Sequence, residues 1–275
     1  MTAERSNVTR IAFIGFGEVG QRFALDLSKV ANVALSAFDI AFDTAAGRDS
    51  ILARTEKLSV AVAASASAAC NCAHIVVSAV TADQTEAVAK AAAAFLKPGQ
   101  IYFDVNSASP ETKACAAIWV NASGAHYVEA AVMAAVKQPG IRVPILAGGP
   151  DAERVAGDLN RLGMNVTPVA TVYGRASAIK LCRSIVIKGL EALMVDCSGA
   201  AKAFGVESEV YASLSGTYPS IDWAQLADNM GERVATHGIR RSAEMREAAD
   251  MLAEKGIDPS LAAAVADAQA RGAKS

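Results

Sequence analysis

The hydrophobic positions of the first 170 residues fall into short apolar runs separated by longer amphipathic or alanine-rich stretches. Apolar runs of about four to eight residues are typical of buried strands, and apolar residues at three- and four-residue spacing are typical of helices. The strands predicted in this way are 11–14, 33–38, 58–64, 74–80, 101–105, 125–132, 143–146 and 165–169. Their alternation with helices indicates an α/β fold with a Rossmann-type doubly wound sheet.

The predicted helices of this first part lie between the strands, at 21–31, 44–57, 83–96 and 151–162. A further helix is expected to begin at Pro110, with Ser109 as its N-cap, because proline suits the first helical position. After residue 170 the strand-like runs stop. Residues 174–204 contain no strong helix breaker, and helices of about 207–215, 221–236, 238–255 and 259–270 follow.

This change in pattern predicts two domains. Residues 1–170 are expected to form the Rossmann domain, and residues 171–275 an all-helical domain. A helix of thirty residues is roughly 45 Å long, so 174–204 is long enough to join the two domains. The second domain is expected to bury its apolar faces by pairing with a second copy of the chain, through residues of about 175–270.

A glycine-rich turn follows the first strand, with the sequence Gly15-Phe16-Gly17-Glu18-Val19-Gly20. The first glycine allows a sharp turn, the second allows the backbone to approach a pyrophosphate, and the third lets the helix pack close to the sheet. The N-terminus of the following helix favours an anion. We therefore expect these six residues to bind a dinucleotide; the alternative is a structural turn without a ligand.

Asp39 ends the second strand, 24 residues after Gly15. A carboxylate at this distance is expected to bind the adenosine ribose, and its charge favours NAD over NADP because it repels a 2′-phosphate. Arg48 and Arg54 leave NADP open, because either guanidinium is within reach of a 2′-phosphate if its segment folds back.

Polar residues also follow the fourth and fifth strands. Val80 ends the fourth strand and Thr81 follows it, and Asn106, Ser107 and Ser109 come after the fifth. Loops at the carboxyl ends of parallel strands share one crevice, so Val80, Thr81 and Asn106 are expected to contact the cofactor. Asn106, Ser107 and Ser109 are expected to contact the substrate, next to a helix N-terminus that favours an anion. The alternative is that Asn106 only forms a turn and Ser109 only caps the helix.

Composition excludes several classes of function. The chain has 275 residues, of which 52% are hydrophobic, and a net charge of −2, so no basic surface for nucleic acid is expected. No apolar run reaches about 18 residues, which argues against a membrane span. Residues 1–9 are polar and do not resemble a secretion signal. The five cysteines fit neither a zinc site nor a disulfide framework, so we expect no metal and a cytoplasmic protein.

Three motifs together resemble those of the β-hydroxyacid dehydrogenases, a family that includes 6-phosphogluconate and 3-hydroxyisobutyrate dehydrogenases. The glycine-rich turn is the first. The second is the substrate loop, Asp104-Val105-Asn106-Ser107-Ala108-Ser109-Pro110, and the third is the entry to the long helix, Gly174-Arg175-Ala176-Ser177-Ala178-Ile179-Lys180. The resemblance covers essentially the whole chain. It is greatest for a poorly characterised branch whose C-terminal domain is 6-phosphogluconate-dehydrogenase-like.

The resemblance implies an NAD(P)-dependent dehydrogenase that acts on the CH–OH group of a small 3-hydroxyacid, in a homodimer. Lys180 is then the general acid/base, since a lysine with a lowered pKa can take the hydroxyl proton. Ser177, Arg183 and Ser184 are expected on the same face of the helix. Spacing alone favours a solvated surface position for Lys180, and it is the family resemblance that reverses this interpretation.

The chain departs from the family pattern in three places. Ser184 stands where the family's K-x-x-x-N motif has a substrate-binding asparagine, with Arg183 beside it. The glycine-rich strand similar to P-V-S-G-G reads Ala131-Val132-Met133-Ala134-Ala135. The family's C-terminal Lys-Asp pair has no clear counterpart, although Arg240, Arg241 and His237 are nearby candidates for binding an anionic substrate. These differences predict a different substrate geometry.

Three alternatives remain open. An oxidative decarboxylase of the 6-phosphogluconate dehydrogenase type needs a second acid, for which Glu191 and Glu244 are candidates. An imine reductase is a second alternative, although the lysine at position 180 argues against it. The third is a nucleotide-binding protein without turnover, which the altered 133–135 segment and Ser184 leave possible.

Overall fold

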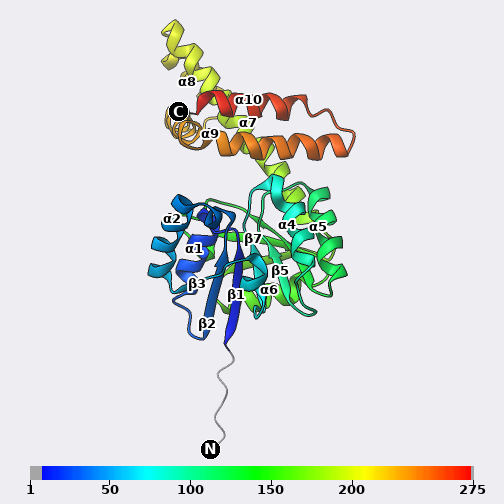
Figure 1. The fold of residues 1–275 in the computed structure, drawn as a ribbon. Helices are drawn as coiled ribbons and strands as arrows, with labels where there is room; N and C mark the ends of the chain where they lie inside the picture. The colour runs from blue at the N-terminus through cyan, green and yellow to red at the C-terminus, as the bar shows by residue number, and fades with distance from the viewer. Residues whose placement is uncertain (1–7, 274–275) are drawn as a thin grey trace, which may run out of the picture. The chain divides into compact units, whose positions relative to one another are not determined.

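The computed structural model describes residues 8–273, apart from the side chains of residues 45, 46, 50, 54 and 57. The chain forms two compact units, one ending at Lys180 and the other beginning at Leu181 (Figure 1). The polar segment before Val8, for which no secretion signal is expected, lies outside the described residues. The assignment of separate roles to a Rossmann domain and a helical domain stays a prediction.

The first unit is built on one eight-stranded sheet, which confirms the predicted doubly wound α/β fold. The strand order is β3-β2-β1-β4-β5-β6-β7-β8. The strands are β1 Thr9–Ile14, β2 Val33–Phe38, β3 Val60–Val62, β4 Ile75–Ser78, β5 Ile101–Asp104, β6 His126–Val132, β7 Pro144–Gly148 and β8 Asn165–Ala170.

One strand pair breaks the parallel pattern. β6 and β7 run antiparallel, with Glu129 opposite Gly148, whereas the neighbouring pairs β5–β6 and β7–β8 are parallel. The connection from β6 to β7 contains only the short 3₁₀ turn η4, Gly140–Arg142. A parallel pair needs a longer crossover that is usually helical, so this connection produces an antiparallel pair. The apolar pattern of the two strands does not contain this information.

The other helices and 3₁₀ turns of the first unit connect the strands. They are α1 Glu18–Leu27, η1 Ile40–Asp43, α2 Ala45–Thr55, η2 Glu56–Leu58, α3 Ala66–Cys70, η3 Ala82–Gln84, α4 Thr85–Ala93, α5 Pro110–Ala122 and α6 Ala152–Arg161. The predicted start of α5 is confirmed, since the Ser109 hydroxyl accepts a hydrogen bond from the Thr112 N–H at 3.2 Å. The short helix α3 was not predicted, because its five residues are too few to show a periodicity.

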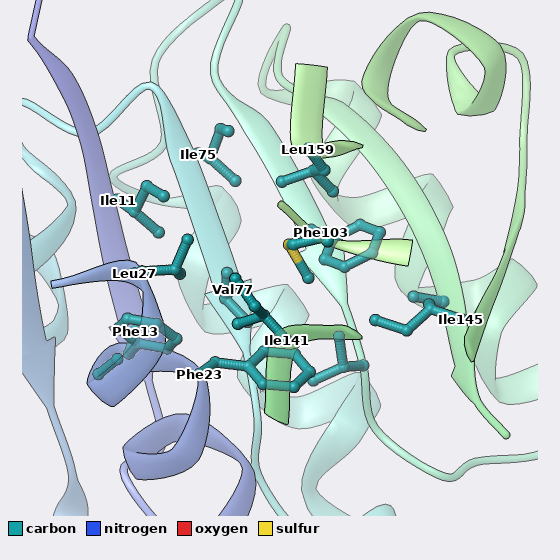
Figure 2. Packing of buried hydrophobic residues seen from close by; sticks show 14 of the residues in the cluster. Ile11, Phe13, Phe23, Leu27, Ile75, Val77, Phe103, Ile141, Ile145 and Leu159 are labelled. Carbon is teal, nitrogen blue, oxygen red and sulfur yellow. The ribbon is translucent and has the colours of Figure 1, made fainter. Parts of the chain in front are cut away.

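Each face of the sheet carries its own hydrophobic core. Alternate residues of β1 point to opposite faces, with Ile11 and Phe13 in one core and Ala12 and Ile14 in the other. The first core is completed by side chains from α1, α2 and α6, and the second by α3, α4 and α5. Figure 2 shows the first core, where side chains from α1, η4 and α6 pack onto β1, β4, β5 and β7. This packing holds the carboxyl ends of the strands in fixed register.

The second unit is helical, as predicted. It contains most of α7, Arg175–Phe204, followed by α8 Glu207–Thr217, α9 Trp223–Glu254 and α10 Ser260–Gly272. Among the described residues, none of the helices combines the length and the apolar character needed to cross a membrane.

The prediction of two helices at 221–236 and 238–255 is wrong, because α9 is a single helix. Gly238 lies in its middle and is buried against α10, where a Cβ would collide with the backbone carbonyl of Gln269. The glycine therefore allows close helix packing instead of ending the helix, and the packing outweighs its cost in helix propensity of roughly 1 kcal/mol.

Candidate functional site

The glycine turn between β1 and α1 leaves open space next to the N-terminus of α1. Gly15 has φ +87°, and a Cβ there would collide with the carbonyl of Ala79 after β4. A Cβ at Gly20 would lie 2.7 Å from the carbonyl oxygen of Gly15, so α1 also packs tightly on the turn. In contrast, a Cβ at Gly17 would have no atom within 4 Å. Gly17 is the N-cap of α1 and provides no side-chain hydrogen bond, so the helix N-terminus is available for an anion.

Phe16, Glu18 and Val19 complete this turn. Phe16 is buried in the first core, where its ring makes an edge-to-face contact with Phe13 at 5.9 Å between centroids. Glu18 and Val19 are the first two residues of α1. The helix therefore begins three residues before the predicted start at residue 21, and Glu18 and Val19 lie in its first turn.

Asp39 connects the glycine turn to the end of β2. Its carboxylate accepts a hydrogen bond from the Phe16 N–H at 2.6 Å, and from the Ala41 N–H at 2.8 Å as N-cap of η1. The two donors hold the carboxylate in one orientation beside the turn. Arg48, considered above as a partner for a 2′-phosphate, donates its Nε–H to the Phe42 carbonyl at 3.0 Å. The side chain of Arg54 lies outside the described residues.

A hollow lies beyond this turn. Its lining includes Phe42, Asp43 and Arg48, which come after β2, and Ala63 and Ala64, which follow β3. Most of its lining comes from residues after β2 and β3. It therefore belongs to the carboxyl edge of the sheet, on the side of the glycine turn away from β4 and β5.

Asn106 links the loops that follow β4 and β5. Its Oδ1 accepts a hydrogen bond from the Val80 N–H at 2.7 Å, and its Nδ2 donates to the Ser78 hydroxyl at 3.0 Å. The amide orientation is determined by the Val80 N–H, which can only donate. Asn106 is buried, and one of its two amide hydrogens is left for another acceptor. Thr81 follows Val80 as the N-cap of η3.

Ser107 and Ser109 lie on the same loop but in different environments. The Ser109 hydroxyl caps α5 and also lies 3.1 Å from the Thr112 hydroxyl, which matches the capping interpretation of this residue. The Ser107 hydroxyl is buried and has no hydrogen-bond partner among the described residues. A buried hydroxyl without a partner costs free energy unless something else satisfies it. Ser107 is therefore the residue of this loop best placed for a ligand.

A buried polar cluster supports this loop, and sequence reasoning missed it. Oδ1 of Asp104 accepts the Asn106 N–H at 2.9 Å and lies 2.9 Å from Nζ of Lys113, while Oδ2 accepts the Tyr127 hydroxyl at 2.6 Å. Burial and the Asp104 charge raise the pKa of Tyr127 well above its usual value, so the phenol remains a donor. The only signal in the sequence was a lysine within the otherwise small and apolar face of α5.

Lys180 is the sixth residue of α7 and the last residue of the first unit. Its helix begins directly after Gly174, which has φ +87°, in the connection that follows β8. Lys180 has interactions within the protein that involve its side chain or backbone. Its role as general acid/base stays a prediction.

Arg183 and Ser184, the other candidates on α7, belong to the second unit. Arg183 is exposed. Ser184 is buried and accepts a hydrogen bond from Nζ of Lys188 at 3.0 Å. Lys188 in turn lies 2.7 Å from the Glu244 carboxylate. Ser184 is therefore part of a buried polar cluster between α7 and α9 that sequence reasoning did not predict.

The remaining candidates of the second unit are on α7 and α9. Glu191 is completely buried, and its Oε2 lies 3.1 Å from NH1 of Arg241. His237 and Arg240 are exposed. Glu191 and Glu244, considered above as second acids, are thus both ion-paired within the helical unit. Because the Arg241 guanidinium is ion-paired with Glu191, fewer of its N–H donors are left to bind an anionic substrate than the sequence suggested.

Comparison with known proteins identifies the family. Residues 10–170 match the NAD binding domain of 6-phosphogluconate dehydrogenase. The chain belongs to the β-hydroxyacid dehydrogenase-like family. Within this family, residues 201–272 match a domain of unknown function, DUF1932. The family's cofactor is a nicotinamide dinucleotide, and the open turn at Gly17 with the fixed Asp39 carboxylate fits such a ligand.

Solved structures of similar proteins cover nearly the whole chain. A conserved hypothetical protein from Sinorhizobium meliloti is 38% identical, over 96% of this chain and 88% of its own, with a TM-score of 0.81. The conserved protein MTH1747, of unknown function and structurally similar to 3-hydroxyacid dehydrogenases, is 31% identical over 96% and 97%, with a TM-score of 0.75. The 3-hydroxyisobutyrate dehydrogenase of Mycobacterium tuberculosis, solved with L-serine, shares the fold at 18% identity over 96% and 93%, with a TM-score of 0.77.

Proposed function

We propose that the protein is an NAD(P)-dependent dehydrogenase that oxidises the CH–OH group of a small 3-hydroxyacid. One observation carries the proposal. The open glycine turn after β1 and the buried Ser107 hydroxyl after β5, which has no partner in the described part of the chain, lie at the same edge of three adjacent strands, β1, β4 and β5. Ligands of doubly wound sheets bind at this edge. The proposed dinucleotide site and a buried polar group that needs a partner therefore lie at the same edge of the sheet.

The cofactor would be held by residues from three loops. The segment from Gly15 to Gly20 would bind the pyrophosphate through backbone N–H groups, and Asp39 the adenosine ribose. Val80 and Thr81 would border the dinucleotide on the β4 side, and Asn106 would contact it with its remaining amide hydrogen. When bound, the nicotinamide supplies the acceptor for the substrate's hydride.

We propose NAD as the cofactor because of how Asp39 is held. Two backbone donors fix its carboxylate beside the glycine turn, so the negative charge cannot easily move away from a 2′-phosphate. The Arg48 side chain donates to a backbone carbonyl, which reduces its freedom to neutralise such a phosphate. A larger thermal shift with NADH than with NADPH at equal concentration is expected. The reverse order would contradict this assignment.

In the reaction, Lys180 accepts the proton of the substrate hydroxyl as the hydride leaves. Ser107 hydrogen-bonds the substrate, and Asn106 holds the loop in place for it. The N-terminus of α5, capped by Ser109, favours the substrate carboxylate. The L-serine in the Mycobacterium tuberculosis structure is itself a small 3-hydroxy acid, which supports this substrate class. Arg183 and Ser184 stay proposed substrate contacts on the basis of family resemblance alone.

The alternatives make different predictions. Decarboxylation after oxidation would release CO₂ and require a second acid, but Glu191 and Glu244 are both ion-paired. A nucleotide-binding protein without turnover would bind NADH, yet no substrate would change the absorbance at 340 nm. An imine reductase would turn over an imine rather than a hydroxyacid.

The experiment that tests the proposed function is a thermal-shift titration with NADH and NADPH, each alone and then with a panel of hydroxy acids and phosphosugar acids. A ligand that binds only the folded protein raises the melting temperature. We expect NADH to raise it and one class of acid to raise it further, and this acid becomes the substrate for steady-state assays. If neither nucleotide shifts the melting temperature at millimolar concentration, the dehydrogenase function is wrong.

We also propose a homodimer formed through residues of about 175–270. Large apolar side chains are exposed on all three long helices of the second unit, namely Val186 and Leu193 on α7, Ile239 on α9 and Leu261 on α10. Val186 and Leu193 are seven residues apart, so they lie on the same side of α7. Light scattering is expected to give a dimer for the native chain and a monomer for Leu193→Asp. A native monomer at micromolar concentration would contradict the proposal.

A further inference from the structure

Glu129 is a buried carboxylate from β6 that caps the long helix α7. Its Oε1 accepts the Ala176 N–H at 2.7 Å, and its Oε2 accepts the Gly174 N–H at 2.8 Å and the Ser177 hydroxyl at 3.2 Å. The side chain has no exposed surface. A negative charge at a helix N-terminus interacts favourably with the helix dipole, and three donors compensate for its burial. The N-cap function that usually comes from the preceding residue is provided here by a strand 45 residues earlier in the sequence.

This cap acts on the part of α7 that contains Lys180. The capped residues, Ala176 and Ser177, precede Lys180 by four and three positions, so all three lie within about one helical turn. Glu129 and Lys180 both belong to the first unit. Because a helix is stiff over so short a distance, fixing its first turn to β6 also fixes the backbone of Lys180 relative to the sheet.

A second contact connects the same turn to the substrate loop. Gly174 has φ +87°, and a Cβ at this position would lie 3.1 Å from Cβ of Pro110. Pro110 is the first residue of α5 and follows Ser109 directly. The start of α7 therefore packs against the start of α5, next to the loop that contains Asn106 and Ser107.

We propose that Glu129 is a positioning residue for Lys180, a role that rests on the proposed function. Its carboxylate holds the first turn of α7 against β6 and against the start of α5. This fixes the distance between the Lys180 side chain and the loop of Ser107. General acid/base catalysis requires the Lys180 amine to lie within hydrogen-bond reach of the substrate hydroxyl, which the loop of Ser107 is proposed to hold. A misplacement of about 1 Å can cost roughly 100-fold in rate. Glu129 contacts neither substrate nor cofactor in this role.

Gly148 provides a way to disturb the cap without changing Glu129. It pairs with Glu129 across β6 and β7, and a Cβ there would collide with Oε1 of Glu129. Gly148→Ala keeps the carboxylate and its charge but pushes it away from the Ala176 N–H. Glu129→Gln keeps the shape of the side chain but places an NH₂ group against one of the two backbone N–H donors.

The test is a double-mutant cycle with Lys180. We expect Glu129→Gln to lower kcat about 10- to 100-fold, with the affinity for NADH changed by less than about twofold. Gly148→Ala should also lower kcat. In the Lys180→Ala background, Glu129→Gln should cause no further loss, because a residue that acts through Lys180 has nothing left to position. The matched control is Glu153→Gln, which replaces an exposed glutamate in the first turn of α6 and should change neither quantity.

Hydrogen exchange provides a readout that does not depend on turnover. The peptide that covers 174–180 should exchange faster in Glu129→Gln than in the native chain, while a peptide from α6 should not change. Near-normal kcat in Glu129→Gln, equal losses of kcat and NADH affinity, or a full additional loss in the Lys180→Ala background would each overturn the positioning role. Near-normal turnover of Lys180→Ala would instead overturn the proposed function, and the exchange of 174–180 would still show whether Glu129 holds the helix.

Discussion

Nζ of Lys113 lies 2.9 Å from Oδ1 of Asp104, and neither side chain has any exposed surface. The same Nζ donates to the Asp104 backbone carbonyl at 2.9 Å, and the carboxylate also accepts the Tyr127 hydroxyl and the Asn106 N–H. Strand β5, helix α5 and strand β6 are joined at this point. Because the loop of Asn106 and Ser107 begins directly after Asp104, the ion pair holds the start of the proposed substrate loop in place.

Removing one partner of this pair should destabilise the protein strongly. Lys113→Met leaves the Asp104 carboxylate buried without its cation, and breaking a buried ion pair typically costs about 3–5 kcal/mol. Urea unfolding, followed by tryptophan fluorescence and circular dichroism, would measure the change. The double variant Lys113→Met/Asp104→Asn should recover part of the loss, because no charge is left unpaired. Lys29→Met, at an exposed position of a weaker pair, is the control and should change stability little.

The two glycines of the turn should respond differently to the same change. Gly17→Ala adds a methyl group in open space, so the melting temperature should fall by only about 2–4 °C. The same methyl group occupies the approach of the pyrophosphate, and the affinity for NADH should fall about tenfold or more. Gly15→Ala should destabilise the fold itself, because φ is +87° and the Cβ collides with Ala79. A fluorescence titration with NADH together with a thermal melt separates the two effects; unchanged NADH affinity in Gly17→Ala would argue against a pyrophosphate at this turn.

Replacing the proposed base should affect turnover and not cofactor binding. Lys180→Ala is expected to lower kcat at least about 100-fold, which is a typical general acid/base contribution. The dissociation constant for NADH should stay nearly the same, since the proposed dinucleotide contacts lie at the ends of β1, β2, β4 and β5 and not on α7. Steady-state kinetics at 340 nm with the substrate found by thermal shift would measure this, with Lys29→Ala as the control. Near-normal turnover would remove Lys180 from the mechanism.

Cys70 and Cys72 should differ in reactivity although only one residue separates them. Burial raises the pKa of the Cys70 thiol to about 12, so at pH 8 almost none of it is the reactive thiolate. Cys72 is exposed. Iodoacetamide at pH 8 should therefore modify Cys72 within minutes to hours and leave Cys70 intact, as measured by mass spectrometry of peptides. Both should react in guanidinium chloride, and equal labelling of the native protein would contradict the burial of Cys70.

Much of the candidate site could be predicted because its signals are local. The turn from Gly15 to Gly20 follows a strand and begins a helix, and Ser109 with Pro110 marks the start of α5. Both features depend on residues within a few positions of each other, so the order of residue types is enough to identify them. The continuity of α9 through Gly238 was not predictable in this way, because the reason for the glycine lies on another helix, at Gln269.

The sequence by itself determined the alternation of strands and helices, the eight-stranded sheet, the glycine-rich turn with Asp39 after the second strand, and the position of Lys180 on a long helix. Only the tertiary structure decided which polar side chains meet. Asn106 bonds to Val80 26 residues away, and Glu129 caps a helix that begins more than 40 residues later. The physical reason is that periodicity and capping act between near neighbours in the chain. A buried carboxylate or amide instead takes whichever partners the packed sheet brings to it, and those partners have no fixed spacing in the sequence.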